Sequence, residues 1–145
     1  MSTPREILAA NRFMTLATAD AGGTPWASPV WFATEDGREL VWVSKPEARH
    51  SQNIAARPEV GIVIFDSQQV PGTVEALYVE ARGEQVPEDE TDRALDVFNR
   101  ASVAQGLPAW PREDVVEPAR HRLYRAVAVE HSVLDGGDHR ARVEL

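Results

Sequence analysis

Two uninterrupted apolar runs frame the middle of the chain. Leu40–Val43 and Val60–Phe65 are rich in Val, Ile and aromatic residues and are bounded by turn-forming residues, a pattern that predicts two buried strands. The polar segment between them predicts one short helix. Ser44, with Glu47 three residues later, has the pattern of a capping box at its start, and Pro58 is expected to end it.

Alternation of apolar and polar residues predicts five further strands. They are Arg12–Ala19, Trp26–Ala33, Val74–Val86, Arg120–Leu134 and Arg140–Leu145. Asp20–Thr24 has the composition of a hairpin turn, and Gly136-Gly137 predicts a turn before the last strand. Pro29 cannot donate a hydrogen bond to a sheet ladder, which places its strand at an edge or at a bulge.

Side-chain parity predicts the faces of the longest late strand, which begins near Arg120. Residues two apart along a strand point to the same side of the sheet. One face is therefore expected to carry Arg125 together with Leu123, Val127, Val129 and Val133.

Two more helices are expected outside the central segment. Thr3 and Glu6 form a second capping-box pattern at the start of a helix over Thr3–Asn11. The acidic residues after Pro87 favour a helix start, and an apolar stripe continues to about Gln105. Six to seven antiparallel strands with short peripheral helices predict a mainly β fold, a small closed barrel, and the length predicts a single domain over residues 1–145.

Composition narrows the function classes. The chain has no cysteine, which excludes disulfides, thiolate metal sites and a cysteine nucleophile, and it has no HExxH pattern, so no metal site is expected. A net charge of −8 argues against a nucleic-acid partner, which would require a broad basic face. No signal-peptide pattern and no run of membrane-spanning length is present, so no membrane association and a cytoplasmic location are expected.

One short segment opposes the overall acidity. Between Lys45 and Arg57 there are three cations and one anion, a local charge of +2, whereas the rest of the chain sums to −10. Cations at a helix N-terminus suit a phosphate-bearing ligand, because backbone N–H groups, the helix dipole and Arg geometry converge there. From charge alone, a solvated helix surface is the favoured explanation of the same residues.

Four segments carry a resemblance to a known family. They are FMTLATAD at Phe13–Asp20, TPWASPVWF at Thr24–Phe32, VWVSKPEARHSQNIAARPEVGIVIFD at Val41–Asp66, and RLYRAVAVEHSVLD at Arg122–Asp135. In this order and spacing the chain resembles the flavin-binding split β-barrel proteins related to pyridoxamine 5′-phosphate oxidase. The resemblance implies a split barrel that binds FMN at the interface of a homodimer.

The same resemblance implies which residues hold the cofactor. The basic pair Arg49 and His50 would contact the flavin phosphate, helped by Ser44 and Lys45, with Val43 at the end of the preceding strand. The flavin ring would run past Trp26, Ala27 and Ser28. Trp110, in a Pro-rich loop, would cover a neighbouring subunit's site. No catalytic acid, base or nucleophile stands out, which suits a protein whose cofactor carries the chemistry.

The function that follows is an FMN-dependent oxidoreductase acting on a small organic substrate. True pyridoxamine 5′-phosphate oxidases carry a C-terminal Arg–His signature that grips the substrate phosphate, and RLYRAVAVEHSVLD does not reproduce it. Vitamin B6 oxidation is therefore not expected. Two alternatives stay open: a deazaflavin-dependent reductase on the same fold, and a non-catalytic flavin-binding protein.

Overall fold

The computed structural model describes residues 1–134 and 138–145. The strands are β1 (Phe13–Ala19), β2 (Pro25–Trp31), β3 (Glu39–Ser44), β4 (Glu59–Phe65), β5 (Ala76–Gln85), β6 (Arg122–Leu134) and β7 (Arg140–Val143). The helices are α1 (Pro4–Ala10), α2 (Arg49–Ala56) and α3 (Thr91–Ala104), with short 3₁₀ turns η1 (Glu88–Glu90) and η2 (Arg112–Asp114). The predicted turn at Gly136-Gly137 lies outside the described residues.

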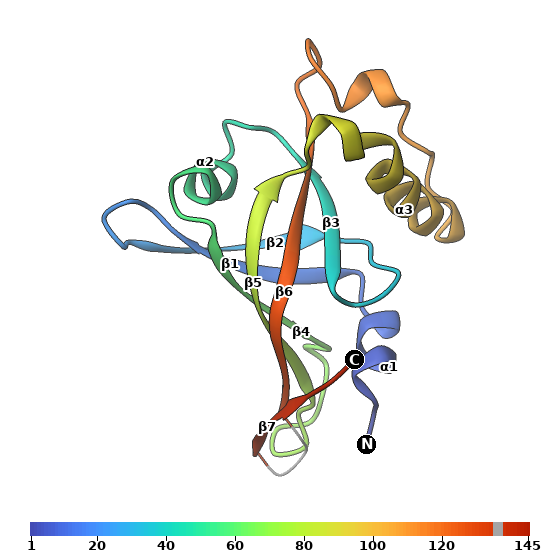
Figure 1. The fold of residues 1–145 in the computed structure, drawn as a ribbon. Coiled ribbons are helices and arrows are strands. Elements are labelled where there is room, and N and C mark those ends of the chain that lie inside the picture. Colours follow the sequence, from blue (N-terminus) through green and yellow to red (C-terminus); the bar gives the residue numbers. More distant parts are fainter. Residues whose placement is uncertain (135–137) are drawn as a thin grey trace.

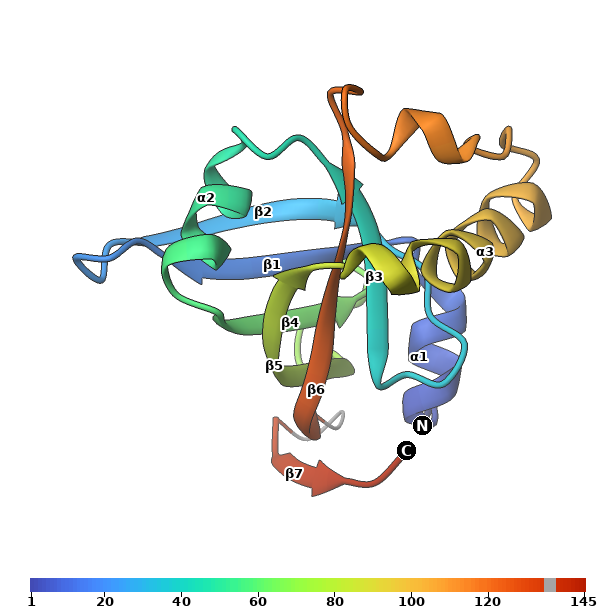
Figure 2. The ribbon, with the colours of Figure 1, turned by 45° about the horizontal axis from the view of Figure 1, so that its top comes forward.

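The strands form one antiparallel sheet in the order β2-β1-β4-β5-β6-β3, with β7 paired to β6. Just beyond β2, Ala33 bridges to Val41 of β3 through two backbone hydrogen bonds of 2.9 and 2.8 Å. The bridge brings the two ends of the sheet together into a split β-barrel (Figures 1 and 2). The mainly β prediction is confirmed, and Pro29 does lie in an end strand of the sheet order.

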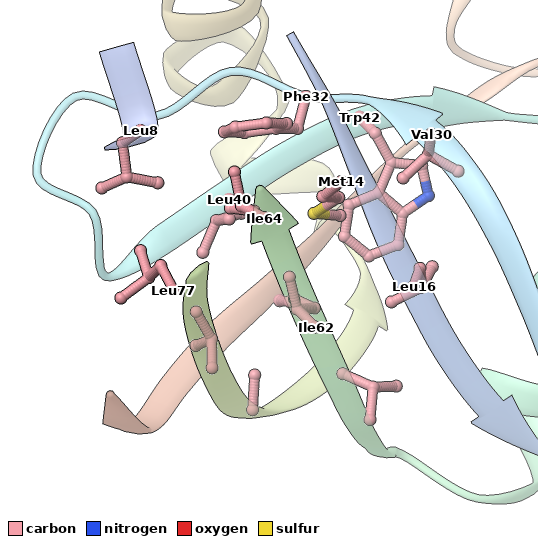
Figure 3. Close-up of a cluster of buried hydrophobic side chains, with 14 of the residues drawn as sticks. Leu8, Met14, Leu16, Val30, Phe32, Leu40, Trp42, Ile62, Ile64 and Leu77 are labelled. Atoms are coloured by element: carbon pink, nitrogen blue, oxygen red, sulfur yellow. The ribbon is translucent and has the colours of Figure 1, made fainter. Parts of the chain in front are cut away.

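The barrel interior is filled by alternate residues of its strands. Leu16, Leu40 and Ile64 are completely buried, and Trp42 packs against Tyr124 with ring centroids 6.1 Å apart. Figure 3 shows these aliphatic side chains converging from β1, β3 and β4 around Trp42. The alternation predicted for the strand at Arg12–Ala19 is confirmed, because Met14, Leu16 and Thr18 are buried while the residues between them are not.

A second apolar cluster lies outside the barrel, where α3 covers β3 and the start of β6. Leu95 and Phe98 of α3 pack with Val41 and Leu123. The predicted stripe of α3 is therefore confirmed. In both ribbon views α3 lies on one side of the molecule and α2 on the other (Figures 1 and 2).

The parity prediction for β6 holds before a bulge and fails after it. Leu123, Arg125 and Val127 do share the outer face, where Leu123 is buried beneath α3. The register of β5 and β6 passes from Glu80↔Glu130 to Ala81↔Ala128, so Val129 is an extra, bulged residue, and it is 67% exposed. A bulge reverses the facing of the residues beyond it. Val133 consequently packs toward the barrel interior.

One capping box is real and the other is not. The Thr3 hydroxyl accepts from the Glu6 N–H at 3.1 Å, and the Glu6 carboxylate accepts from the Thr3 N–H at 2.9 Å. Ser44, in contrast, is the last residue of β3 and pairs with Arg122. The prediction that Ser44 and Glu47 cap the second helix is wrong, because that helix begins at Arg49 with Ala48 as its N-cap.

No helix among the described residues is long and apolar enough to cross a membrane.

Candidate cofactor site

The N-terminus of α2 has no side-chain cap. Ala48 occupies the N-cap position in an extended conformation (φ −60°, ψ 145°), and no side chain accepts a hydrogen bond from the first turn. The first backbone N–H groups of a helix have no partner inside the helix. Together with the positive end of the helix dipole, these donors favour an anion at this place.

His50 connects this helix start to the end of β3. Its Nε2 lies 2.8 Å from the Ser44 hydroxyl oxygen. Burial lowers the pKa of His50 below its ordinary value, because desolvation penalises the imidazolium form. At neutral pH the ring is accordingly neutral, and the Ser44 bond fixes how it faces the cleft.

Arg49 points in a different direction. Its guanidinium lies over the Trp26 ring, with Cζ 4.1 Å from the ring centroid. Asp20, at the β1–β2 turn, has a lowered pKa, first because the Thr24 N–H donates to it and also because Arg49 is near. Arg49 therefore lies between α2 and the hairpin, held by a cation–π contact and no ion pair within the described residues.

A cleft of about 710 Å³ opens beside His50. Its volume falls in the range of small-molecule sites. One wall is Pro29–Trp31 of β2, and the other is α3 with the loop that follows it, from Leu107 to Pro111. Ser44 and His50 form a polar end, whereas the remaining walls are mainly apolar.

The loop that forms the far wall is held by one side chain of α3. The Asn99 amide donates to the Trp110 carbonyl at 2.9 Å and accepts from the Trp110 N–H at 2.8 Å. The Trp110 ring also packs edge-on against His121 at 5.2 Å. The wall is therefore built before any ligand binds, and it lines the cleft of its own subunit.

The eight predicted site residues do not all converge. Val43, Ser44 and His50 line the cleft. Lys45 is exposed before the helix, and Arg49 lies on Trp26. Along β2 the side chains alternate, so Ala27 points outward while Trp26 and Ser28 take the opposite face. The assignment of these residues to the cofactor stays a prediction.

The sequence alone did not point to Trp31 and Phe98 as residues of the apolar walls. Trp31 and Phe98 meet edge to face at 5.0 Å, and Trp31 donates from Nε1 to the Gln105 side chain at 3.3 Å. These residues are far apart in the chain, so only the fold brings them together. The Pro-rich composition of residues 106–111 was the one local signal for a loop of fixed conformation at this wall.

The fold places the chain among split β-barrel proteins. Residues 3–130 match the family model for pyridoxamine 5′-phosphate oxidase, and the chain belongs to this family.

Two curated relatives agree with this placement. The chain is 31% identical over 97 residues to pyridoxine/pyridoxamine 5′-phosphate oxidase of Pseudomonas entomophila (67% of this chain, 42% of the relative). It is 32% identical over 121 residues to the enzyme of the same name from Cupriavidus necator (78% of this chain, 53% of the relative). The chain thus spans about half the length of the curated relatives it matches.

Solved structures share the fold at lower identity. A heme binding protein from Mycobacterium smegmatis superposes with a TM-score of 0.76 at 20% identity, over 99% of this chain and 59% of that one. An F420 reductase superposes with a TM-score of 0.65 at 20% identity, over 91% of this chain and 98% of that one. A FAD-binding protein from Mesorhizobium loti superposes with a TM-score of 0.61 at 22% identity, over 97% of this chain and 91% of that one. At these identities the likeness concerns the fold.

Proposed function

We propose that the chain binds FMN and acts as a flavin-dependent oxidoreductase on a small organic substrate. The observation that carries the proposal is the uncapped N-terminus of α2 at the polar end of an apolar cleft. A flavin mononucleotide has a phosphate that suits the helix N-terminus and a planar ring that suits the apolar cleft. Family membership supports the same cofactor class.

The residues of the chain would bind the flavin and orient it. The flavin, when bound, supplies the capacity to accept and donate hydride or electrons. The backbone N–H groups at the start of α2, Ser44 and His50 would hold the phosphate, with Arg49 able to swing from Trp26 toward it. Pro29 and Val30 would flank one side of the flavin ring, which leaves the aromatic end of the cleft at Trp31, Phe98 and Trp110 for a substrate.

Oxidation of vitamin B6 phosphates is not part of the proposal. The curated relatives have that name, but the segment RLYRAVAVEHSVLD at Arg122–Asp135 does not reproduce the Arg–His pattern that would hold a substrate phosphate. We propose a different small substrate for this chain.

We further propose a homodimer that completes the site. The outward side chains of β1, β2 and β4 form one nearly uncharged face, with Glu59 at its edge the single charged member. The others are Phe13, Thr15, Ala17, Ala19, Pro25, Ala27, Pro29, Trp31, Gly61, Val63 and Phe65. A large apolar face of this kind marks an interface, and Pro29 and Trp31 join it to the cleft.

The dimer is tested by charge at the centre of this face. Ala27→Glu would place like charges opposite each other across a symmetric interface. We expect light scattering to show monomers at micromolar concentration, and FMN affinity to fall with the dimer. Ala104→Glu, at the exposed end of α3, is the matched control. An unchanged dimer in Ala27→Glu would place the interface elsewhere.

Two alternatives share the site. A deazaflavin reductase would use the same phosphate-binding helix, and the F420 reductase fold neighbour supports keeping it. A non-catalytic flavin-binding protein would bind FMN without turnover. A cytoplasmic location is also part of the proposal, to be checked by cell fractionation.

Spectroscopy separates these candidates. Purified protein is titrated with FMN, with a deazaflavin and with hemin, following absorption and fluorescence. We expect FMN to bind, and the loaded protein to oxidise a nicotinamide nucleotide in steady state. Binding of deazaflavin alone would favour the reductase alternative, binding without turnover would favour the storage alternative, and binding of hemin alone would contradict all three.

A further inference from the structure

We propose that the apolar end of the cleft takes an uncharged, planar ring compound as substrate. This inference rests on the proposed function and deepens it by naming the chemical class of the substrate. The observations that carry it are the aromatic walls, the sign of the charges in the lining, and the fixed position of the Trp110 loop.

The walls at this end are aromatic. Trp31 and Phe98 present a T-shaped pair 5.0 Å apart, and Trp110 faces the cleft from the loop after α3. Aromatic side chains pack favourably against flat rings through both burial and quadrupole contacts. A flat ring compound fits these walls better than a branched or flexible chain.

The apolar end of the cleft has no cation among its described lining residues to bind an anion. Among the described residues, neither lysine nor arginine lines this cleft, and Asp114 is its one carboxylate. His50 is at the opposite, polar end, where burial lowers its pKa and leaves it neutral at pH 7. A substrate phosphate or carboxylate placed near Trp110 would lose its hydration without gaining a cation.

The wall is also preorganised. Asn99 holds the Trp110 backbone by a donor and an acceptor at once, and the Trp31 Nε1–H is taken up by Gln105. The Trp110 backbone and the Trp31 indole N–H therefore already have partners, so these groups do not select a ligand through hydrogen bonds. Selection falls to shape and charge.

A matched pair of probes tests the inference. Isothermal titration calorimetry compares 2-naphthol with 2-naphthyl phosphate on the FMN-loaded protein and on the cofactor-free protein. We expect naphthol to bind the loaded protein at least tenfold more tightly than its phosphate ester. Trp110→Ala should weaken naphthol binding about tenfold, while Trp110→Phe should retain it.

Two surface variants test the charge argument without disturbing the core. Leu107 and Asp114 are exposed residues of the lining. Leu107→Arg and Asp114→Asn should each raise the affinity for naphthyl phosphate, relative to that for naphthol, about two- to fivefold, as expected for exposed charges.

The outcomes separate the inference from the proposed function. Equal binding of the two probes to the loaded protein would overturn the inference and leave FMN binding intact. Loss of naphthol binding when FMN is loaded would assign the aromatic walls to the flavin ring and also overturn it. Failure of FMN to bind would overturn the proposed function, and the probe preference of the cofactor-free protein would still decide whether the cleft selects uncharged rings.

Discussion

Two groups of cations on this barrel have opposite surroundings. Beneath the start of α3, Arg125 contacts Glu39, Glu84 and Glu90, with its side chain only 13% exposed. At the start of α2, Arg49 rests on Trp26 and makes no ion pair with any described residue. The first group is neutralised by carboxylates of the protein itself, whereas Arg49 has no ion-pair partner among the described residues.

The difference teaches how to separate structural from functional charge in this molecule. Arg93 joins the α3 network through Glu39 and Glu90, and hydrogen bonds first from Arg93 and then from Arg125 hold the pKa of Glu39 below its ordinary value. This network fixes η1 and α3 to the barrel. At α2 the same residue type is kept near an uncapped helix end, which suits a ligand phosphate.

The largest effect should come from breaking the neutralised group. Arg125→Ala would leave Glu39 and Glu90 with Arg93 as their remaining partner and Glu84 with none among the described residues. We expect a loss of about 2 kcal/mol in the free energy of unfolding, because Arg125 and Glu39 are mostly shielded from water whereas Glu84 and Glu90 are partly exposed. Urea denaturation at fixed protein concentration measures it. Arg100→Ala, whose partners Glu35 and Asp96 are exposed, should cost less than about 1 kcal/mol. Equal losses would contradict the structural role given to Arg125.

Arg49, at the start of α2, should show the reverse. Arg49→Ala is expected to weaken FMN binding at least tenfold, about 1.4 kcal/mol, while the free energy of unfolding changes by less than about 0.5 kcal/mol. Flavin fluorescence quenching gives the affinity. Arg57→Ala is the matched control, because Arg57 ends the same helix and donates to the Ala21 carbonyl. If Arg57→Ala weakened FMN binding equally, the effect would reflect the loss of one positive charge anywhere on α2, and the specific role of Arg49 would be contradicted.

Acidification should act through His50. Because burial lowers its pKa in the folded protein, the unfolded chain binds this proton more readily, and stability falls as pH drops below the ordinary value of 6.5 toward the folded pKa. The contribution is fully present above 6.5. His50→Gln should remove this part of the pH dependence, seen as the difference between two urea-denaturation series from pH 7.5 to 5. A difference that stays constant with pH would contradict the buried, neutral state of His50.

The sequence predicted the barrel well because strand alternation and turn residues are local signals. The same capping-box pattern occurs at Thr3 with Glu6 and at Ser44 with Glu47, but only Thr3 and Glu6 form a capping box. Ser44 fails because β3 continues through it to pair with Arg122, a tertiary contact that local pattern does not contain. The bulge at Val129 likewise depends on the register with β5.

The candidate site was predictable only at its polar end. Ser44 and His50 are six residues apart and could be linked by family resemblance. Trp31, Phe98 and Trp110 meet only after β2, α3 and the following loop have packed, and nothing in their local sequence marks them as neighbours.

We propose the uncapped start of α2 as an anion site, and substitution of its N-cap, Ala48→Asp, decides whether it is one. Aspartate at this extended N-cap would accept from the first-turn N–H groups and supply its own negative charge. We predict a gain of about 0.5–1 kcal/mol in the free energy of unfolding together with weaker FMN binding, whereas Ala48→Asn should stabilise similarly and weaken FMN less. A more stable Ala48→Asp protein that binds FMN as tightly as the unmodified chain would contradict the account.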